Sequence, residues 1–181
     1  MRRAAAVTGP AIGRWLAPRP AFGAAALACL ALIGWALWLQ YGRGEEPCPL
    51  CILQRVAVLG LAAVFAAGAV HAPAGLALRR YAAAIVGVAL AGAGVAGWHL
   101  RLQHLPRDRV PECGPGLQFM IEQFPLVEVL GRVFRGSGEC AEAGWRLLGV
   151  TIPGWTLLWF LGLAALAVAV ASRHGGTGRS G

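Results

Sequence analysis

Charged residues are scarce in this chain, and lysine is absent altogether. Asp, Glu, Lys and Arg make up 13% of its 181 residues, whereas an ordinary soluble domain carries about 25%. Hydrophobic residues account for 57%, and the mean hydropathy is +0.62. This balance excludes an ordinary soluble domain and indicates an integral membrane protein. All 16 basic residues are arginine, and we attach no functional meaning to the missing lysine.

Acidic residues are also missing from four long apolar segments. A helix rises 1.5 Å per residue, so about 20 apolar residues cross the roughly 30 Å of hydrocarbon in a bilayer. The sequence therefore predicts an all-α membrane protein, a four-helix transmembrane bundle that forms one domain over residues 1–181. The predicted spans are about 21–39, 51–70, 81–100 and 152–171, with outer loops at about 40–50 and 101–151. Small residues in the third span predict close helix packing, namely Gly87, Gly92, Gly94 and Gly97.

A clear signal-peptide cleavage site is missing after the first segment, which is also too long for a signal core. We therefore predict that this segment stays in the mature protein as a span. Residues 26–29 (Ala-Leu-Ala-Cys) faintly resemble a lipoprotein cleavage site, but the apolar run continues well beyond them. Cys29 is then expected to be an inert residue of the helix core.

One side of the predicted bundle has no acidic residue. Eight arginines lie there, in the two terminal segments and the short loop between the second and third spans: Arg2, Arg3, Arg14, Arg19, Arg79, Arg80, Arg173 and Arg179. The other eight arginines and all eight acids belong to the opposite side. The positive-inside rule then places both termini in the cytoplasm. Because the charges are scattered over membrane-flanking segments, the sequence does not predict nucleic-acid binding.

Four cysteines fall on the opposite, non-cytoplasmic side, where disulfides form and persist. Cys48 and Cys51 form a C-x-x-C pair, which leaves Cys113 and Cys140 as a second pair in the long outer loop. A C-x-x-C disulfide closes too small a ring to stabilise a fold much, so redox chemistry is the preferred interpretation. Two structural disulfides and a zinc site are the alternatives. Structural zinc sites usually take two close-spaced pairs, and we predict no metal.

Pro49 suits the first position of a helix, with Cys48 at its cap and Cys51 in its first turn. A helix N-terminus favours negative charge, which lowers the pKa of a thiol. Arg55 lies four residues after Cys51, on the same predicted face. It could stabilise a Cys51 thiolate or donate hydrogen bonds to a bound acceptor; the alternative is an arginine that reaches to the membrane surface. His99, at the end of the third span, could bind the acceptor or relay protons; the alternative is an ordinary interfacial histidine.

The long outer loop contains a helical pattern of apolar residues. Leu117, Met120, Ile121 and Phe124 precede Pro125, and a second stretch then places Leu126, Val129, Leu130, Val133 and Phe134 on one face. This spacing, with a proline at the start, predicts a short amphipathic helix. Such a helix either lies flat on the membrane or packs against the bundle.

Together these features resemble the DsbB family of disulfide bond formation proteins, over nearly the whole chain from the first span to Trp155. The resemblance includes the Cys48-Pro49-Leu50-Cys51 motif, Arg55 four residues later, and Cys113 in the second outer loop. Its most specific part is the run Gly138-Glu139-Cys140-Ala141-Glu142 with Trp145, Leu148-Gly149 and Pro153-Gly154-Trp155. One residue departs from a common family pattern: Gln54 precedes Arg55 where glutamate is often found.

The resemblance implies a disulfide-generating protein-dithiol:quinone oxidoreductase of the bacterial inner membrane, with its redox cysteines in the periplasm. Its partner would be a periplasmic DsbA-type thiol oxidase, and electrons would leave to the quinone pool of the membrane lipid. Cys113 would form the mixed disulfide with the partner, and Cys140 would exchange with Cys48, freeing Cys51 as a thiolate beside the quinone. Arg55 would bind and polarise that quinone, and His99 matches a family histidine near it.

Three other readings are weighed against this one. A vitamin K epoxide reductase-like protein also combines a helical bundle with C-x-x-C and quinone chemistry, but its active pair lies in a late helix. A DsbI-type oxidase would serve one dedicated partner. A non-enzymatic membrane protein would hold the cysteines in structural disulfides or on a metal. The sequence does not distinguish ubiquinone from menaquinone, and it predicts no particular oligomeric state.

Overall fold

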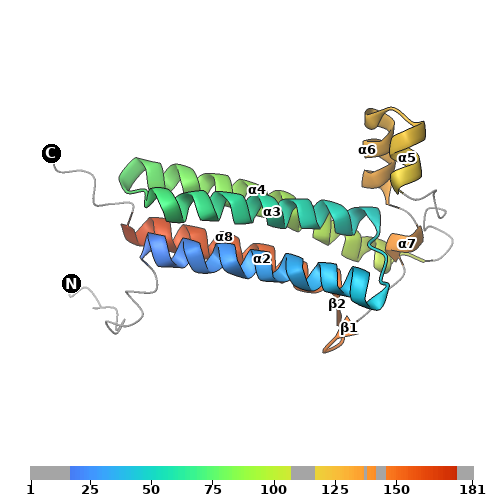
Figure 1. The fold of residues 1–181 in the computed structure, drawn as a ribbon, viewed down its shortest axis with the longest axis horizontal. Helices are drawn as coiled ribbons and strands as arrows, with labels where there is room; N and C mark the ends of the chain where they lie inside the picture. Colours follow the sequence, from blue (N-terminus) through green and yellow to red (C-terminus); the bar gives the residue numbers. More distant parts are fainter. Residues whose placement is uncertain (1–16, 107–116, 137, 142–145, 175–181) are drawn as a thin grey trace.

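Four long helices lie side by side in the computed structural model, which describes residues 17–106, 117–136, 138–141 and 146–174 (Figure 1). They are α2 (Pro18–Arg43), α3 (Pro49–His71), α4 (Gly75–Gln103) and α8 (Ile152–His174). Each is long and apolar enough to cross a membrane. The predicted all-α bundle of four spans is therefore confirmed, and the chain is a multi-pass membrane protein.

The helices continue past the predicted spans at nearly every end. α4 is the longest, with 29 residues, or about 44 Å at 1.5 Å per residue. Backbone hydrogen bonding persists beyond the apolar segment until a local signal stops it. In α2, Pro18 occupies the first turn and Gly44 ends the helix with φ 69°, in the left-handed region, where glycine carries no steric cost. Hydropathy therefore located the spans but not the helix ends.

Aromatic rings and small residues fill the centre of the bundle. α4 packs against α8 and α3, and α2 packs against α3. A Cβ at Gly92 would lie 2.5 Å from the Phe160 ring, so only glycine lets α4 and α8 approach this closely there. The prediction of close packing is thus confirmed for Gly92, whereas a Cβ at Gly87, Gly94 or Gly97 would meet nothing within 4 Å.

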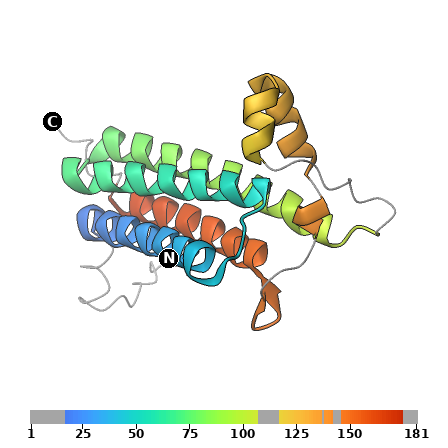
Figure 2. The same cartoon turned by 45° about the vertical axis from the view of Figure 1, so that its right-hand side comes forward.

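Two short helices, α5 (Leu117–Gln123) and α6 (Leu126–Arg135), project to one side at one end of the bundle (Figures 1 and 2). Met120, Val129 and Val133 form a small buried cluster that packs against Leu53 of α3. The predicted amphipathic helix is present, and its inner strip contacts the bundle. Other apolar residues of the pair stay exposed, with Leu126 at 69% and Phe134 at 54%.

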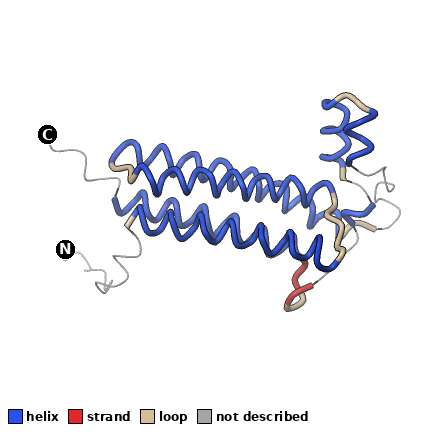
Figure 3. The backbone as a smooth tube through the Cα atoms, in the orientation of Figure 1, coloured by secondary structure: helices blue, strands red, loops and turns tan. Residues whose placement is uncertain are grey.

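A β-hairpin joins this outer region to α8, which the all-α prediction did not include. Its strands are β1 (Arg146–Leu147) and β2 (Val150–Thr151), drawn as the red segment in Figure 3. The two turn residues, Leu148 and Gly149, have φ values of 52° and 80°, as tight two-residue hairpins require. Trp155 Nε1 donates to the Leu147 carbonyl over 3.1 Å. The hairpin is thereby attached to the first turn of α8.

Candidate active site

The Cys48–Cys51 pair forms the start of α3, as the proline rule predicts. Cys48 is the N-cap, with extended backbone at φ −63° and ψ 160°, and its sulfur accepts a hydrogen bond from the Cys51 amide over 3.4 Å. The two Sγ atoms lie 3.0 Å apart. Cys48 is 9% exposed, whereas Cys51 is more open. Both sulfurs are thus within reach of one another at a helix N-terminus, where negative charge is favoured.

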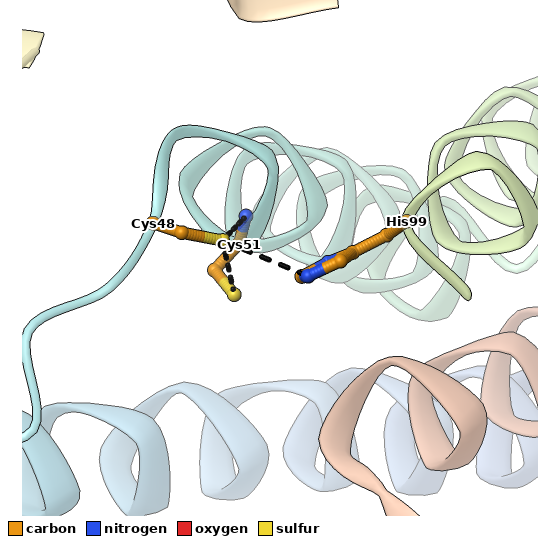
Figure 4. A group of neighbouring side chains, drawn as sticks. All are labelled: Cys48, Cys51 and His99. Atoms are coloured by element: carbon orange, nitrogen blue, oxygen red, sulfur yellow. Dashed lines mark hydrogen bonds between the residues drawn. The ribbon is translucent and has the colours of Figure 1, made fainter. Parts of the chain in front are cut away.

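His99 reaches toward this pair from α4 (Figure 4). Its side chain is 2% exposed, and its Nε2 lies 3.8 Å from Cys48 Sγ. The alternative of an ordinary interfacial histidine does not describe this buried position. The contact is long for a hydrogen bond to sulfur, but it places a group that can gain or lose a proton next to a cysteine.

Gln54 holds the other side of the His99 ring. Gln54 is 3% exposed, and its Nε2 lies 3.1 Å from His99 Nδ1. Its Oε1 accepts a hydrogen bond from the Thr156 hydroxyl over 2.5 Å. In this arrangement the amide donates to Nδ1, so the neutral imidazole carries its proton on Nε2, facing Cys48. A polar chain from α8 through α3 to α4 therefore ends at the cysteine pair.

The side chains of Gln54, His99 and Thr156 can also form their hydrogen bonds in a second arrangement, with the Gln54 amide reversed. Thr156 Oγ1 also lies 3.0 Å from the Pro153 carbonyl. If the hydroxyl donates there, a reversed Gln54 amide can donate to Thr156 and accept from a protonated Nδ1 of His99. Because amide orientation and histidine tautomer are set by the network, reversing Gln54 moves the unprotonated nitrogen of His99 to the side of Cys48.

Arg55 points away from this network, toward α2. Its guanidinium donates to Gln40 Oε1 over 2.5 Å and to the Ala36 carbonyl over 3.2 Å. A charge near a membrane interior is costly unless polar groups surround it, and α2 supplies two of them. A guanidinium has five N–H groups, so donors remain after these two bonds.

Cys140 approaches the pair from the outer segments. It lies in the short helix α7 (Gly138–Ala141), is fully buried, and shares an apolar cluster with Cys48, Leu50 and Leu102. α7 packs against α4, the helix that carries His99. The structure therefore brings three of the four predicted cysteines to one end of the bundle. Cys113, the fourth, lies outside the described residues.

Sequence reasoning missed the partners of the predicted residues. Gln54 was noted only as a departure from a family pattern, and Gln40 and Thr156 were not singled out. All three are polar residues near the outer ends of apolar spans, and buried polar groups need hydrogen-bond partners. That signal could have selected them, although it does not reveal which residue each one contacts.

A hollow at the other end of the bundle is unrelated to this chemistry. Its volume is about 300 Å³, and its lining includes Pro18, Ala72 and His174. Ala72 in its lining follows the last residue of α3, and Cys48 precedes the first. The 23 residues of α3 therefore separate the hollow from Cys48 by about 35 Å. Because Pro18 begins α2 and His174 ends α8, the hollow also places the start of the first span and the end of the last span at the same end of the bundle.

Comparison with known proteins identifies the family. The family model described as "Disulfide bond formation protein DsbB" matches residues 18–170. A Disulfide bond formation protein B from Nitrosococcus oceani is 50% identical over 148 residues, which is 82% of this chain and 88% of the relative. Proteins of the same name are 49% identical in Methylococcus capsulatus, over 78% of this chain and 87% of the relative, and 54% identical in Chromohalobacter salexigens, over 74% and 78%. With its cysteine pair at the mouth of a four-helix membrane bundle, this chain belongs to the DsbB family of disulfide bond formation proteins.

Proposed function

We propose that this protein is a thiol:quinone oxidoreductase that reoxidises a periplasmic DsbA-type dithiol protein. The observation that carries the proposal is the packing of Cys140 in one cluster with Cys48, the N-terminal member of the C-x-x-C pair. Thiol–disulfide exchange requires one sulfur to reach another. A second cysteine held against the pair is what a two-step relay needs.

The proposed relay would pass two electrons from the partner through two pairs of cysteines. One partner thiolate attacks Cys113 of a Cys113–Cys140 disulfide, and the second partner thiol then releases an oxidised partner and two reduced cysteines. Cys140 next attacks Cys48 of the Cys48–Cys51 disulfide, and Cys51 leaves as a thiolate. Cys113 then attacks Cys140, which restores the Cys113–Cys140 disulfide and leaves Cys48 reduced.

A quinone would supply the final oxidising power: the Cys48 and Cys51 sulfurs would re-form their disulfide and give up two electrons and two protons, and the quinone would leave as a quinol. DsbA has a potential near −120 mV, so an ordinary protein disulfide cannot reoxidise it favourably. A lipid-soluble acceptor also accounts for a cysteine pair at the edge of a membrane span. The donor groups suit a quinone carbonyl: Arg55 retains N–H groups beyond those used by α2.

This chain's own residues would then serve distinct purposes. The more open Cys51 would face the acceptor, while the buried Cys48 would exchange with Cys140. His99 would accept or return a proton at Cys48 through Nε2. Arg55 would orient the acceptor. Ubiquinone and menaquinone are the two candidate acceptors.

The proposed location is the bacterial inner membrane, with both termini in the cytoplasm and the cysteines in the periplasm. Support comes from the charge distribution, because the end that contains Arg19, Arg79, Arg80 and Arg173 has no acidic residue. Oxidising conditions on the opposite side would keep the cysteines competent for exchange.

The test is quinone reduction by the purified protein, supplied with a reduced DsbA-type partner and with ubiquinone or menaquinone. We expect turnover that is abolished by Cys51→Ser and by Cys113→Ser. Cys29→Ala is the matched control, because Cys29 is buried in the bundle core away from the pair. Absence of turnover with either quinone, or full turnover in Cys51→Ser, would refute the proposal.

A further inference from the structure

We propose that the reduced Cys48–Cys51 pair, together with His99, binds one thiophilic divalent cation of the Zn²⁺ or Cd²⁺ class. The Sγ atoms of both cysteines and a ring nitrogen of His99 all lie within 4.8 Å of one another. Figure 4 shows the three side chains converging from α3 and α4. The spacing of the four outer cysteines predicts no metal site, whereas the structure adds His99 to the Cys48–Cys51 pair as a third candidate ligand.

The distances are close to those of a real site. Zinc binds sulfur at about 2.3 Å and histidine nitrogen at about 2.0–2.1 Å in a tetrahedron. Two sulfurs on such an ion lie about 3.8 Å apart, from the same bond lengths. The Sγ atoms of Cys48 and Cys51 are 3.0 Å apart, and Cys48 Sγ is 3.8 Å from His99 Nε2. A sulfur and a nitrogen on such an ion lie about 3.6 Å apart, and the three ligand atoms all lie within 4.8 Å of one another. Side-chain movements of about an ångström would therefore bring all three ligands to bonding distance.

The residues behind His99 suit a metal ligand. A ligating histidine usually donates its second N–H to a neighbouring acceptor, which fixes the ring and raises its basicity. The reversed Gln54 amide accepts from Nδ1, while Thr156 accepts from the amide and donates to the Pro153 carbonyl, 3.0 Å away. Every polar group of the network then has a partner, and Nε2 is unprotonated.

Charge also favours this site. Two thiolates neutralise a divalent cation, and Gln54 adds no charge, so the complex is neutral in a position where most neighbouring groups are apolar. A buried uncompensated charge would be costly there. Three protein ligands leave the fourth position of a tetrahedron to water or another small ligand.

Binding occurs only in the dithiol state. The ion displaces one proton from each of the two thiols, and no electron moves. A sulfur bound to metal cannot form the Cys48–Cys51 disulfide or exchange with Cys140. On the proposed function, the cation would therefore stop turnover reversibly, and this consequence rests on that function whereas the binding does not.

The test titrates Cd²⁺ into the reduced full-length protein in detergent, without partner or quinone, and follows the sulfur-to-cadmium charge-transfer absorption. Because a reduced Cys113 and Cys140 could also bind metal, a Cys113→Ser/Cys140→Ser variant is titrated in parallel. We expect one equivalent bound to that variant and none bound after its Cys48–Cys51 pair is oxidised. His99→Ala should weaken binding by at least about tenfold, and Gln54→Leu by about tenfold. Cys29→Ala and His104→Ala are the matched controls and should leave the Cd²⁺ affinity unchanged.

Three results would overturn the proposal: no saturable binding to the reduced protein, loss of binding in the Cys113→Ser/Cys140→Ser variant, or affinity that His99→Ala leaves unaltered. If cation binding is found in a protein that does not reduce quinone, the proposed function fails while the metal site stands. If quinone turnover is found without cation binding, only the metal site fails. In an active protein, Zn²⁺ should slow quinone reduction, and a chelator should restore it.

Discussion

Gln54 connects three helices through one side chain, because an amide can donate on one side and accept on the other. Replacing it with leucine keeps the size but leaves His99 Nδ1 without its partner, in a site where Gln54 is 3% exposed. The Thr156 hydroxyl keeps the Pro153 carbonyl as an acceptor. One unpaired buried polar group costs about 1–3 kcal/mol. We expect Gln54→Leu to lower the thermal unfolding temperature measured in detergent. Gln123→Leu, at an exposed position of α5, is the control, and equal stability of the two variants would contradict the network.

Arg55 is held by two acceptors of α2 at once, Gln40 Oε1 and the Ala36 carbonyl. Lysine keeps the positive charge but lacks the planar guanidinium, whose several N–H groups can bind two acceptors and still donate to a third. If Arg55 orients the quinone, Arg55→Lys should raise the KM for quinone by about tenfold, the effect of one lost charged hydrogen bond. The KM for the protein partner should stay constant. A change in the partner's KM alone would place Arg55 outside the quinone site.

Motif spacing was enough to predict some of these residues. The placement of Cys48 at a helix cap, with Pro49 and Cys51 in the first turn, follows from four consecutive residues and is confirmed. The contacts of His99 were not predictable in the same way, because 51 positions separate it from Cys48 and 45 from Gln54. Thr156 is 102 positions from Gln54. The packing of α4 against both α3 and α8 brings these side chains together.

Helix contacts at the element scale depend on single small residues. A Cβ at Gly92 would lie 2.5 Å from the Phe160 ring, whereas a Cβ at Gly94, on the same helix, would meet nothing within 4 Å. Overpacking costs about 1–3 kcal/mol. We therefore expect Gly92→Ala to reduce the thermal stability of the bundle, and Gly94→Ala to leave it equal or slightly higher. Similar effects of the two substitutions would show that α4 and α8 can separate freely.

Periodicity and hydropathy predicted the major elements for a physical reason: a helix in lipid satisfies its own backbone and must be apolar along its length. The β-hairpin escaped prediction because two-residue strands carry no alternating pattern. Its position depends on distant contacts, including the hydrogen bond from the Thr151 hydroxyl to Gln103 Oε1, 2.9 Å long. The amphipathic pattern of α6 was visible, but not that Val129 and Val133 would face Leu53 while Leu126 stays exposed.

The whole molecule has two chemically different ends, and their orientation can be measured. Glu45 lies at the cysteine end and Ser172 at the arginine-rich end, and both are exposed. In a chain with its native cysteines replaced by serine, we expect Glu45→Cys to react with a membrane-impermeant maleimide in cells whose outer membrane has been permeabilised. Ser172→Cys should react only after the inner membrane is opened. The reverse pattern would invert the proposed topology.

Cys48 caps α3 with the same sulfur that would exchange with Cys140 in the proposed relay, so its redox state would affect the backbone hydrogen bonding of the first helical turn. The Cys51 amide donates to that sulfur, and a thiolate accepts a hydrogen bond more strongly than a neutral sulfur does. Each catalytic cycle would thus tighten and loosen the start of a membrane helix. Hydrogen–deuterium exchange at the Cys51 amide would then act as a built-in reporter, slower when Cys48 is a thiolate and faster when it is in a disulfide.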